Sequence, residues 1–174
     1  FNDEDGDVLT FSLSANDINE GFTVTKGNDG SAQTRTPTFD YETKSNYSVM
    51  LTASDGTDST TKGITINVTN ENDNSPVFTS SATFSAAENQ TAIGTVTATD
   101  ADGDTLTYSI SGSEITINSS SGVIAFASAP DYETKSTYTA TITASDGTNS
   151  TTQDITVTVT DANDSSPVFT SSAN

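Results

Sequence analysis

The stretch Asp40-Tyr41-Glu42-Thr43-Lys44 recurs, residue for residue, as Asp131-Tyr132-Glu133-Thr134-Lys135. At the same offset of 91 residues, Ala53-Ser54-Asp55-Gly56-Thr57 recurs as residues 144–148. Identical segments that keep one register over this distance indicate tandem repeats, each about as long as one small domain. The sequence therefore predicts two modules, and not one large domain, within these 174 residues.

A second repeated segment marks the boundary between the modules. Asn72-Asp73 before Ser75-Pro76-Val77-Phe78 recurs as Asn163-Asp164 before Ser166-Pro167-Val168-Phe169. Proline lacks a backbone N–H, so strand pairing stops there and a short, stiff connection begins. We predict a first repeat at residues 1–74, a second at 75–165, and the start of a third at 166–174.

The two copies differ near their beginnings. Residues 3–7 match residues 100–104 at an offset of 97, so the first copy carries six additional residues, which we place within 26–37. Residues 76–97 have no counterpart in the first copy. We therefore expect the chain to be a piece of a longer array, with the first copy truncated at its N-terminal side.

Short segments in which apolar residues alternate with polar ones predict strands. In residues 137–144, threonines alternate with Tyr, Ala and Ile, which is the period of a strand with one buried face. The same or a shorter pattern occurs in segments 64–68, 96–98, 106–110, 115–117 and 155–159, and the continuous apolar run 123–126 predicts one more strand. No segment has the apolar spacing of a helix. We predict an all-β fold of tandem Greek-key β-sandwich domains with about seven strands each.

The charge of the chain limits its partners. There are 24 Asp and Glu residues against 5 Lys and Arg, which gives a formal net charge of -19 at pH 7. Such a chain repels phosphates and anionic lipid surfaces, so we expect no nucleic-acid partner. The sequence also has no apolar run long enough to span a bilayer, so we expect no membrane insertion of these residues.

The absent residue types argue against catalysis. The sequence contains no His and no Cys, so an imidazole base, a thiol nucleophile and a zinc–thiolate site are all missing. Paired carboxylates that resemble those of a glycosidase are better explained as ion ligands. We expect that the chain is not an enzyme.

The acidic residues gather where predicted strands end. Asp100 and Asp102 follow a strand two residues apart, so their carboxylates point the same way from an extended backbone. Clustered carboxylates are the oxygen ligands that Ca²⁺ prefers, and segment 70–74 offers further side-chain and backbone oxygens. A solvated acidic surface is the alternative, and the Asp-Gly pairs at 55 and 146 are equally typical of turns.

Taken together, these motifs resemble those of the cadherin family, in register over the whole chain. The matching elements are the linker-like 70–78, the Asp-x-Asp-like Asp100-Ala101-Asp102, the Leu-Asp-Arg-Glu-like Phe39-Asp40-Tyr41-Glu42, the Pro-Glu-Asn-like Ala87-Glu88-Asn89, and Asp146, which falls where the family has another ligand. The pairs Gly6-Asp7 and Gly103-Asp104 resemble bacterial cadherin-like repeats more than animal ones. The resemblance implies cadherin/Ig-like sandwiches.

The resemblance further implies that Ca²⁺ is bound between successive repeats. At the junction inside this chain it assigns, as ligands, Asp40, Glu42, Glu71, Asn72, Asp73, Asn74, Asp100, Asp102 and Asp146, with Asn72 contributing its carbonyl. The site of Asn74, Asp100, Asp102 and Asp146 is expected to be complete. Sites that require a first-copy equivalent of Glu88 are expected to be impaired.

The remaining motif residues are expected to form half-sites. These are Asp3, Asp5 and Asp55 toward a preceding repeat, and Glu88, Asp131, Glu133 and Asp164 toward a following one. In the second linker Ala162 stands where the first has Glu71, and Ser165 stands where it has Asn74. We therefore expect fewer or weaker ions at that junction.

The function implied is that of an extracellular, cell-surface module, a calcium-rigidified structural or adhesive spacer whose partners are the neighbouring repeats. The alternative is a carbohydrate- or protein-binding module of a secreted protein, although the absence of Trp argues against sugar stacking. The absence of Trp also removes the strand-swap adhesion of animal type I and II cadherins. Homophilic association, and a head-to-tail association in which residues 167–173 supply a strand to the first copy, are further hypotheses.

Overall fold

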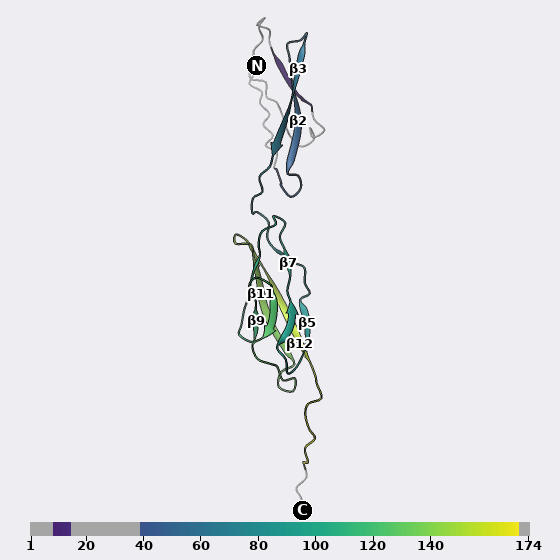
Figure 1. The fold of residues 1–174 in the computed structure, drawn as a ribbon, viewed down its shortest axis with the longest axis vertical. Helices are drawn as coiled ribbons and strands as arrows, with labels where there is room; N and C mark the ends of the chain where they lie inside the picture. Colours follow the sequence, from purple (N-terminus) through teal and green to yellow (C-terminus); the bar gives the residue numbers. More distant parts are fainter. Residues whose placement is uncertain (1–8, 15–38, 171–174) are drawn as a thin grey trace, which may run out of the picture. The chain divides into compact units, whose positions relative to one another are not determined.

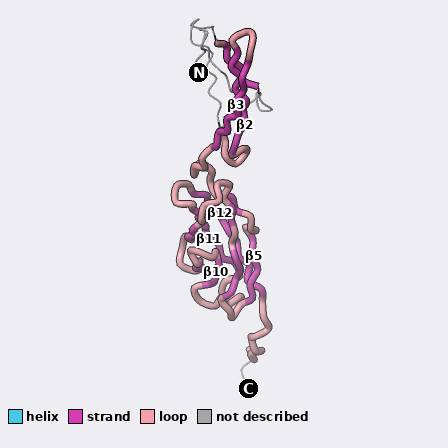
Figure 2. Tube along the Cα trace, turned by 45° about the horizontal axis from the view of Figure 1, so that its top comes forward, coloured by secondary structure: helices cyan, strands magenta, loops and turns pink. Residues whose placement is uncertain are grey.

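The computed structural model describes residues 9–14 and 39–170, which form strands, turns and loops without a helix (Figures 1 and 2). The all-β prediction is therefore confirmed, and the described part of the chain offers no helix that could cross a membrane. The chain divides into two compact units, Phe1–Glu71 and Asn72–Asn174. The predicted repeat boundaries stay predictions, and the predicted insertion within 26–37 lies outside the described residues.

The described part of the first unit is one antiparallel sheet in the order β1-β2-β3. Its strands are β1 (Thr10–Ser14), β2 (Asn46–Ser54) and β3 (Ser59–Asn67). Tyr47, Val49 and Ala53 of β2 are buried, and their odd-numbered spacing is the period-two pattern of one strand face. A tight turn around Gly56, whose φ is +100°, joins β2 to β3.

The second unit is a β-sandwich. One sheet has the order β5-β12-β11-β8 and the other the order β6-β10-β9, while β4 pairs with β7. In the larger sheet β5 runs parallel to β12, and the other neighbours are antiparallel. The strands are β4 (Val77–Phe78), β5 (Thr83–Ala87), β6 (Ala92–Thr95), β7 (Ala98–Thr99), β8 (Thr107–Ile110), β9 (Ile115–Ile117), β10 (Val123–Phe126), β11 (Thr137–Ser145) and β12 (Ser150–Thr160).

The core of this sandwich is built from alternate residues of both sheets. Ile142 of β11 is fully buried in one apolar cluster with the fully buried Ile124 of β10, and Ala144 of β11 is also fully buried. Val157 and Val159 of β12 complete the same core. The threonines between these residues are exposed or partly buried, so the alternation predicted from the sequence is confirmed here.

The strand predicted around residues 96–98 differs from the structure. It divides into β6 and β7, and the fully buried Val96 lies between them. The Val96 N–H donates to the carbonyl of Gly122 at 2.9 Å, so Val96 is bonded to the turn before β10 and not to a strand. Gly122 has a φ of +69°, and a Cβ there would lie 2.2 Å from the Val96 carbonyl oxygen, so the approach requires glycine.

The strand directions bring loops together at the two ends of the sandwich. The β11–β12 turn, the loop 100–106 that leads to β8, and residues 72–76 lie at one end, where hydrogen bonds join them. Residues that follow β5, β10 and β12 meet at the other end. These two ends hold the acidic residues that the sequence analysis selected within the second unit.

Candidate metal centre

The loop after β7 carries three carboxylates on a short stretch of backbone. Asp100, Asp102 and Asp104 each place one oxygen within 4.8 Å of the others. The Asp102 N–H donates to Asp100 Oδ1 at 3.0 Å, which turns the loop back on itself. Gly103, between Asp102 and Asp104, has a φ of +81°, a left-handed conformation that glycine adopts without strain. The loop therefore brings carboxylate oxygens of Asp100 and Asp102 close together, and their convergence on one ion stays a prediction.

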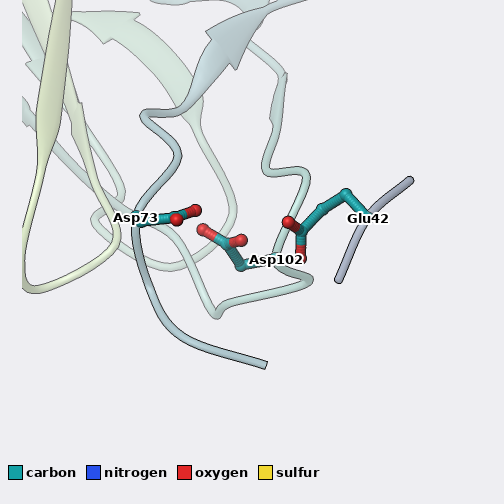
Figure 3. A group of neighbouring side chains, drawn as sticks. All are labelled: Glu42, Asp73 and Asp102. Atoms are coloured by element: carbon teal, nitrogen blue, oxygen red, sulfur yellow. The ribbon is translucent and has the colours of Figure 1, made fainter. Parts of the chain in front are cut away.

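Asp102 also holds the segment that precedes β4. The backbone N–H of Asn74 donates to Asp102 Oδ2 at 2.9 Å, and Asn74 Nδ2 donates to Asp102 Oδ1 at 2.8 Å. Figure 3 shows the carboxylates of Asp73 and Asp102 turned toward one another, with one oxygen of each within 4.8 Å of the other. Glu42, labelled in the same figure, belongs to the first unit.

The turn after β11 contributes the third element. Asp146 Oδ1 accepts the backbone N–H groups of Thr148 and Asn149, each at 2.6 Å. Gly147, with a φ of +99°, permits this tight turn. Burial acts to raise the pKa of Asp146, but the N–H groups of Asn149 and Thr148, together with the side chains of Asn72 and Asn149, outweigh burial and lower this pKa. The turn interpretation and the ligand interpretation of Asp146 are compatible, because the turn uses only one carboxylate oxygen.

Two buried oxygens at this end have no hydrogen-bond partner among the described residues. They are Asp100 Oδ2 and Asp146 Oδ2. A buried carboxylate oxygen without a donor is costly, and a bound cation removes that cost. The donor set of carboxylate, amide and backbone oxygens fits a hard cation such as Ca²⁺ and does not fit metals that prefer nitrogen or sulfur.

The opposite end of the second unit is organised around the buried Glu88. Only 4% of Glu88 is exposed. Its Oε1 accepts the backbone N–H of Ala162 at 2.6 Å, and its Oε2 accepts that of Tyr132 at 2.8 Å. Both oxygens are thus satisfied by the protein, and they fix the segment that follows β12.

Glu88 lies within a second carboxylate cluster, in which Glu88, Glu133 and Asp161 each place one oxygen within 4.8 Å of the others. The largest single effect on the pKa of Glu133 is a hydrogen bond from the backbone of Glu133, which lowers this pKa. Desolvation and the negative charges of Glu88, Asp161 and Asp164 together outweigh that hydrogen bond, so the pKa of Glu133 is raised. The carboxylates at this end repel one another.

Asp131 and Asp164 lie beside this cluster with other partners. Asp131 accepts from the Thr134 N–H at 3.2 Å and from Thr134 Oγ1 at 2.9 Å, and these bonds lower its pKa. Asp164 Oδ2 accepts from Asn89 Nδ2 at 2.6 Å, and Asn89 has a φ of +61°. Both predicted ligands therefore contribute hydrogen bonds to the local structure.

Comparison with known proteins agrees with the motifs. Residues 81–160 match the family model of the cadherin domain. The chain belongs to the cadherin-like family. It is 34% identical, over 93% of its length, to mouse Cadherin EGF LAG seven-pass G-type receptor 1, and 38% identical, over 77% of its length, to human Protocadherin Fat 4. The chain spans 6% and 3% of the length of these two relatives.

Solved cadherin structures share the fold. A structure described as the protocadherin gammaB7 EC3-6 cis-dimer matches 90% of this chain and 41% of that chain, with a TM-score of 0.76 and 30% identity. Mouse Cadherin-23 EC22-24 matches 90% of this chain and 55% of that chain, with a TM-score of 0.68 and 27% identity. The predicted cadherin/Ig-like sandwich is confirmed, and the likeness to bacterial repeats stays a prediction.

The first repeat holds the remaining predicted ligands of this cadherin-like chain. Asp40 accepts from Thr43 N at 3.1 Å and from Thr43 Oγ1 at 2.8 Å, as its counterpart Asp131 does from Thr134. Asp55 Oδ1 accepts the N–H groups of Thr57 and Asp58 in a turn. Glu42 and Glu71 are exposed. Asp3 and Asp5 lie outside the described residues.

Three residues of these ends were missed by the sequence analysis. Asp104 belongs to a repeated Gly-Asp pair that was noticed but not assigned as a ligand. Asp161 was hidden by the repeat comparison, because its counterpart in the first copy is Asn70. Asn149 stands next to the Asp-Gly turn, and the only motif that marks it is the glycosylation sequon Asn149-Ser150-Thr151, which does not indicate a contact with the linker. Asn72 faces this residue with its side chain, since its Oδ1 accepts from Asn149 Nδ2 at 3.1 Å.

Proposed function

We propose that this chain is a calcium-binding, extracellular tandem-repeat module that acts as a calcium-rigidified structural or adhesive spacer at a cell surface. The observation that carries the proposal is that Asp100 Oδ2 and Asp146 Oδ2 are buried and have no hydrogen-bond partner among the described residues, at the end of the second unit where Asp102 accepts from Asn74. Negative oxygens that lack donors are the arrangement that a divalent cation stabilises.

The chemistry of the donor set favours Ca²⁺. Calcium accepts six to eight oxygen ligands in flexible geometry, including backbone and amide oxygens, whereas Mg²⁺ requires a near-ideal octahedron. Zinc prefers His and Cys, and the sequence contains neither. The affinity needs only to match extracellular calcium, so we expect a dissociation constant on the order of 10⁻⁴–10⁻³ M.

The mechanical role follows from the origin of the predicted ligands. Asn72, Asp73 and Asn74 precede the second sandwich, and Glu42 and Glu71 belong to the first repeat. An ion that takes oxygens from both groups restricts the motion of the linker, and without the ion the carboxylates repel one another. The predicted ligands Asp40, Glu42 and Glu71 are part of this proposal.

The relatives support the same setting. A seven-pass receptor and a protocadherin carry similar repeats, which supports a cell-surface location and a role in adhesion and not in catalysis. The cis-dimer named for the protocadherin structure supports the proposal that copies of this chain associate with one another. The neighbouring repeats of the same chain remain the partners that the proposed site requires.

Small-angle X-ray scattering of the full chain, with calcium and with a chelator, tests the proposal. We expect a longer maximum dimension and a better-defined profile with calcium, together with binding heat in titration calorimetry. Identical scattering in both conditions and no calcium heat would leave an acidic spacer that does not respond to calcium, and the proposed function would be wrong.

A further inference from the structure

Asn149, the last residue of the β11–β12 turn, holds a distant segment of the chain through its side chain. Its Nδ2 donates to Asn72 Oδ1 at 3.1 Å and to the backbone carbonyl of Asn74 at 3.0 Å. Asn149 is partly buried, and both acceptors belong to the same unit. These two bonds connect the β11–β12 turn to the segment Asn72–Asn74.

The side chain of Asn149 can bond to Asn72 and Asn74 because the turn is held by the backbone of Asn149. The Asn149 N–H donates to Asp146 Oδ1 at 2.6 Å, and the Asn149 carbonyl accepts the Asp146 N–H at 3.2 Å. The amide group therefore projects from a fixed backbone. A hydrogen bond from a pre-ordered donor loses less conformational entropy than one from a mobile donor.

The matching turn of the first repeat shows that the turn itself does not need the amide. At the same offset of 91 residues, the first repeat has Asp58 in place of Asn149. The Asp58 N–H donates to Asp55 Oδ1 at 2.6 Å, and the Asp58 carbonyl accepts the Asp55 N–H at 3.2 Å. Because an aspartate supports the same turn, the role of the amide at 149 lies in its contacts with Asn72 and Asn74.

We propose that Asn149 is a positioning residue that holds Asn72–Asn74 against the second repeat before a cation arrives. Asn74 also donates its backbone and side-chain N–H groups to Asp102. We call the hydrogen bonds from Asn149 to Asn72 and Asn74 the clamp; together with Asp102 the clamp holds this segment from two sides. A carbonyl or amide oxygen has two lone pairs, so Asn74 O and Asn72 Oδ1 can accept from Asn149 and still face an ion. Binding to a pre-ordered site avoids the ordering cost, which strengthens it.

The clamp is tested in the full chain under chelator, by NMR measurement of amide exchange at Asn74. Asn149→Asp removes both donors and keeps the size of the side chain and, as Asp58 shows, the turn. Asn149→Ala removes the donors without adding charge, and Thr148→Ala is the control in the same turn. We expect exchange at Asn74 to accelerate about tenfold or more in both Asn149 variants, because two hydrogen bonds of ordinary strength are lost. Exchange at the core residues Ile142 and Ile155 is expected to stay unchanged.

The effect on the ion rests on the proposed function and is measured separately, by calcium calorimetry of Asn149→Ala. We expect an apparent dissociation constant weaker by about threefold or more, with unchanged stoichiometry, because the linker must be ordered on binding. Unchanged exchange at Asn74 in both variants, or faster exchange throughout the core, would overturn the clamp even if calcium binds. Faster exchange confined to the linker, with no calcium heat in any form, would uphold the clamp and overturn the proposed function.

Discussion

The two ends of the second repeat use the same residue types in different ways. At one end, Asp100 and Asp146 each keep a buried oxygen without a partner among the described residues. At the other, both oxygens of the buried Glu88 accept backbone N–H groups, from Ala162 and Tyr132. Acidic composition alone therefore does not distinguish a site that a cation completes from a carboxylate that the protein already satisfies. The hydrogen bonds make that distinction, and they predict different responses to substitution.

The largest effect on stability is expected at the end that the protein satisfies. Glu88→Ala leaves two buried backbone N–H groups without their charged acceptor, so we expect a loss of about 3 kcal/mol in the free energy of unfolding. Urea unfolding in chelator measures it. Glu114→Ala is the control, because its ion pair with Lys135 at 2.6 Å is exposed and should contribute less than about 1 kcal/mol. Equal losses in the two variants would contradict the structural role of Glu88.

A smaller effect, seen only with calcium, is expected at the other end. Asp102→Ala should abolish the stabilisation that calcium gives the second repeat. At 10 mM calcium and a dissociation constant near 1 mM, that stabilisation is about 1.4 kcal/mol. Thermal unfolding with and without calcium measures it, and Asp154→Ala is the control, since Asp154 accepts from Thr141 Oγ1 at 2.6 Å, away from both ends. An Asp102→Ala chain that keeps the full calcium response would show that the ion binds elsewhere.

The smallest effect is a pH dependence at the Glu88 end. The raised pKa of Glu133 means that ionised Glu133 disfavours folding at neutral pH, and this disadvantage disappears as pH falls from the folded-state pKa to the ordinary value of 4.5. In chelator, Glu133→Gln should therefore be more stable than the parent chain at pH 7, with the difference vanishing below about pH 4.5.

Asp131→Asn provides a control of opposite sign for this pH dependence. The hydrogen bonds from Thr134 lower the pKa of Asp131, so its ionised form favours folding. Asp131→Asn should be less stable than the parent at pH 7, and the difference should be lost as pH falls through the folded-state pKa. Two pH profiles that shift in the same direction would contradict the assigned environments.

The sequence predicted the architecture because sandwich strands carry a period-two pattern that is independent of their partners. The resemblance to cadherin motifs led to the prediction that Asp100, Asp102 and Asp146 share one ion, and this stays a prediction. The hydrogen bonds of Asn74 with Asp102 and Asn149 place the loop of Asp102 and the turn of Asp146 at one end. The break at Val96 could not be predicted, because it depends on a close approach to Gly122, a residue distant in sequence. Asn149 escaped for a similar reason, since its acceptors lie 75 and 77 residues away.

A crystal structure of the full chain grown with calcium tests the central claim most directly, with anomalous scattering to identify the ion. We predict an anomalous peak at about 2.3–2.6 Å from Asp100 Oδ2 and Asp146 Oδ2, the distance range of calcium–oxygen bonds. Ordered water or an added protein donor at both oxygens, with no anomalous peak at millimolar calcium, would contradict the account.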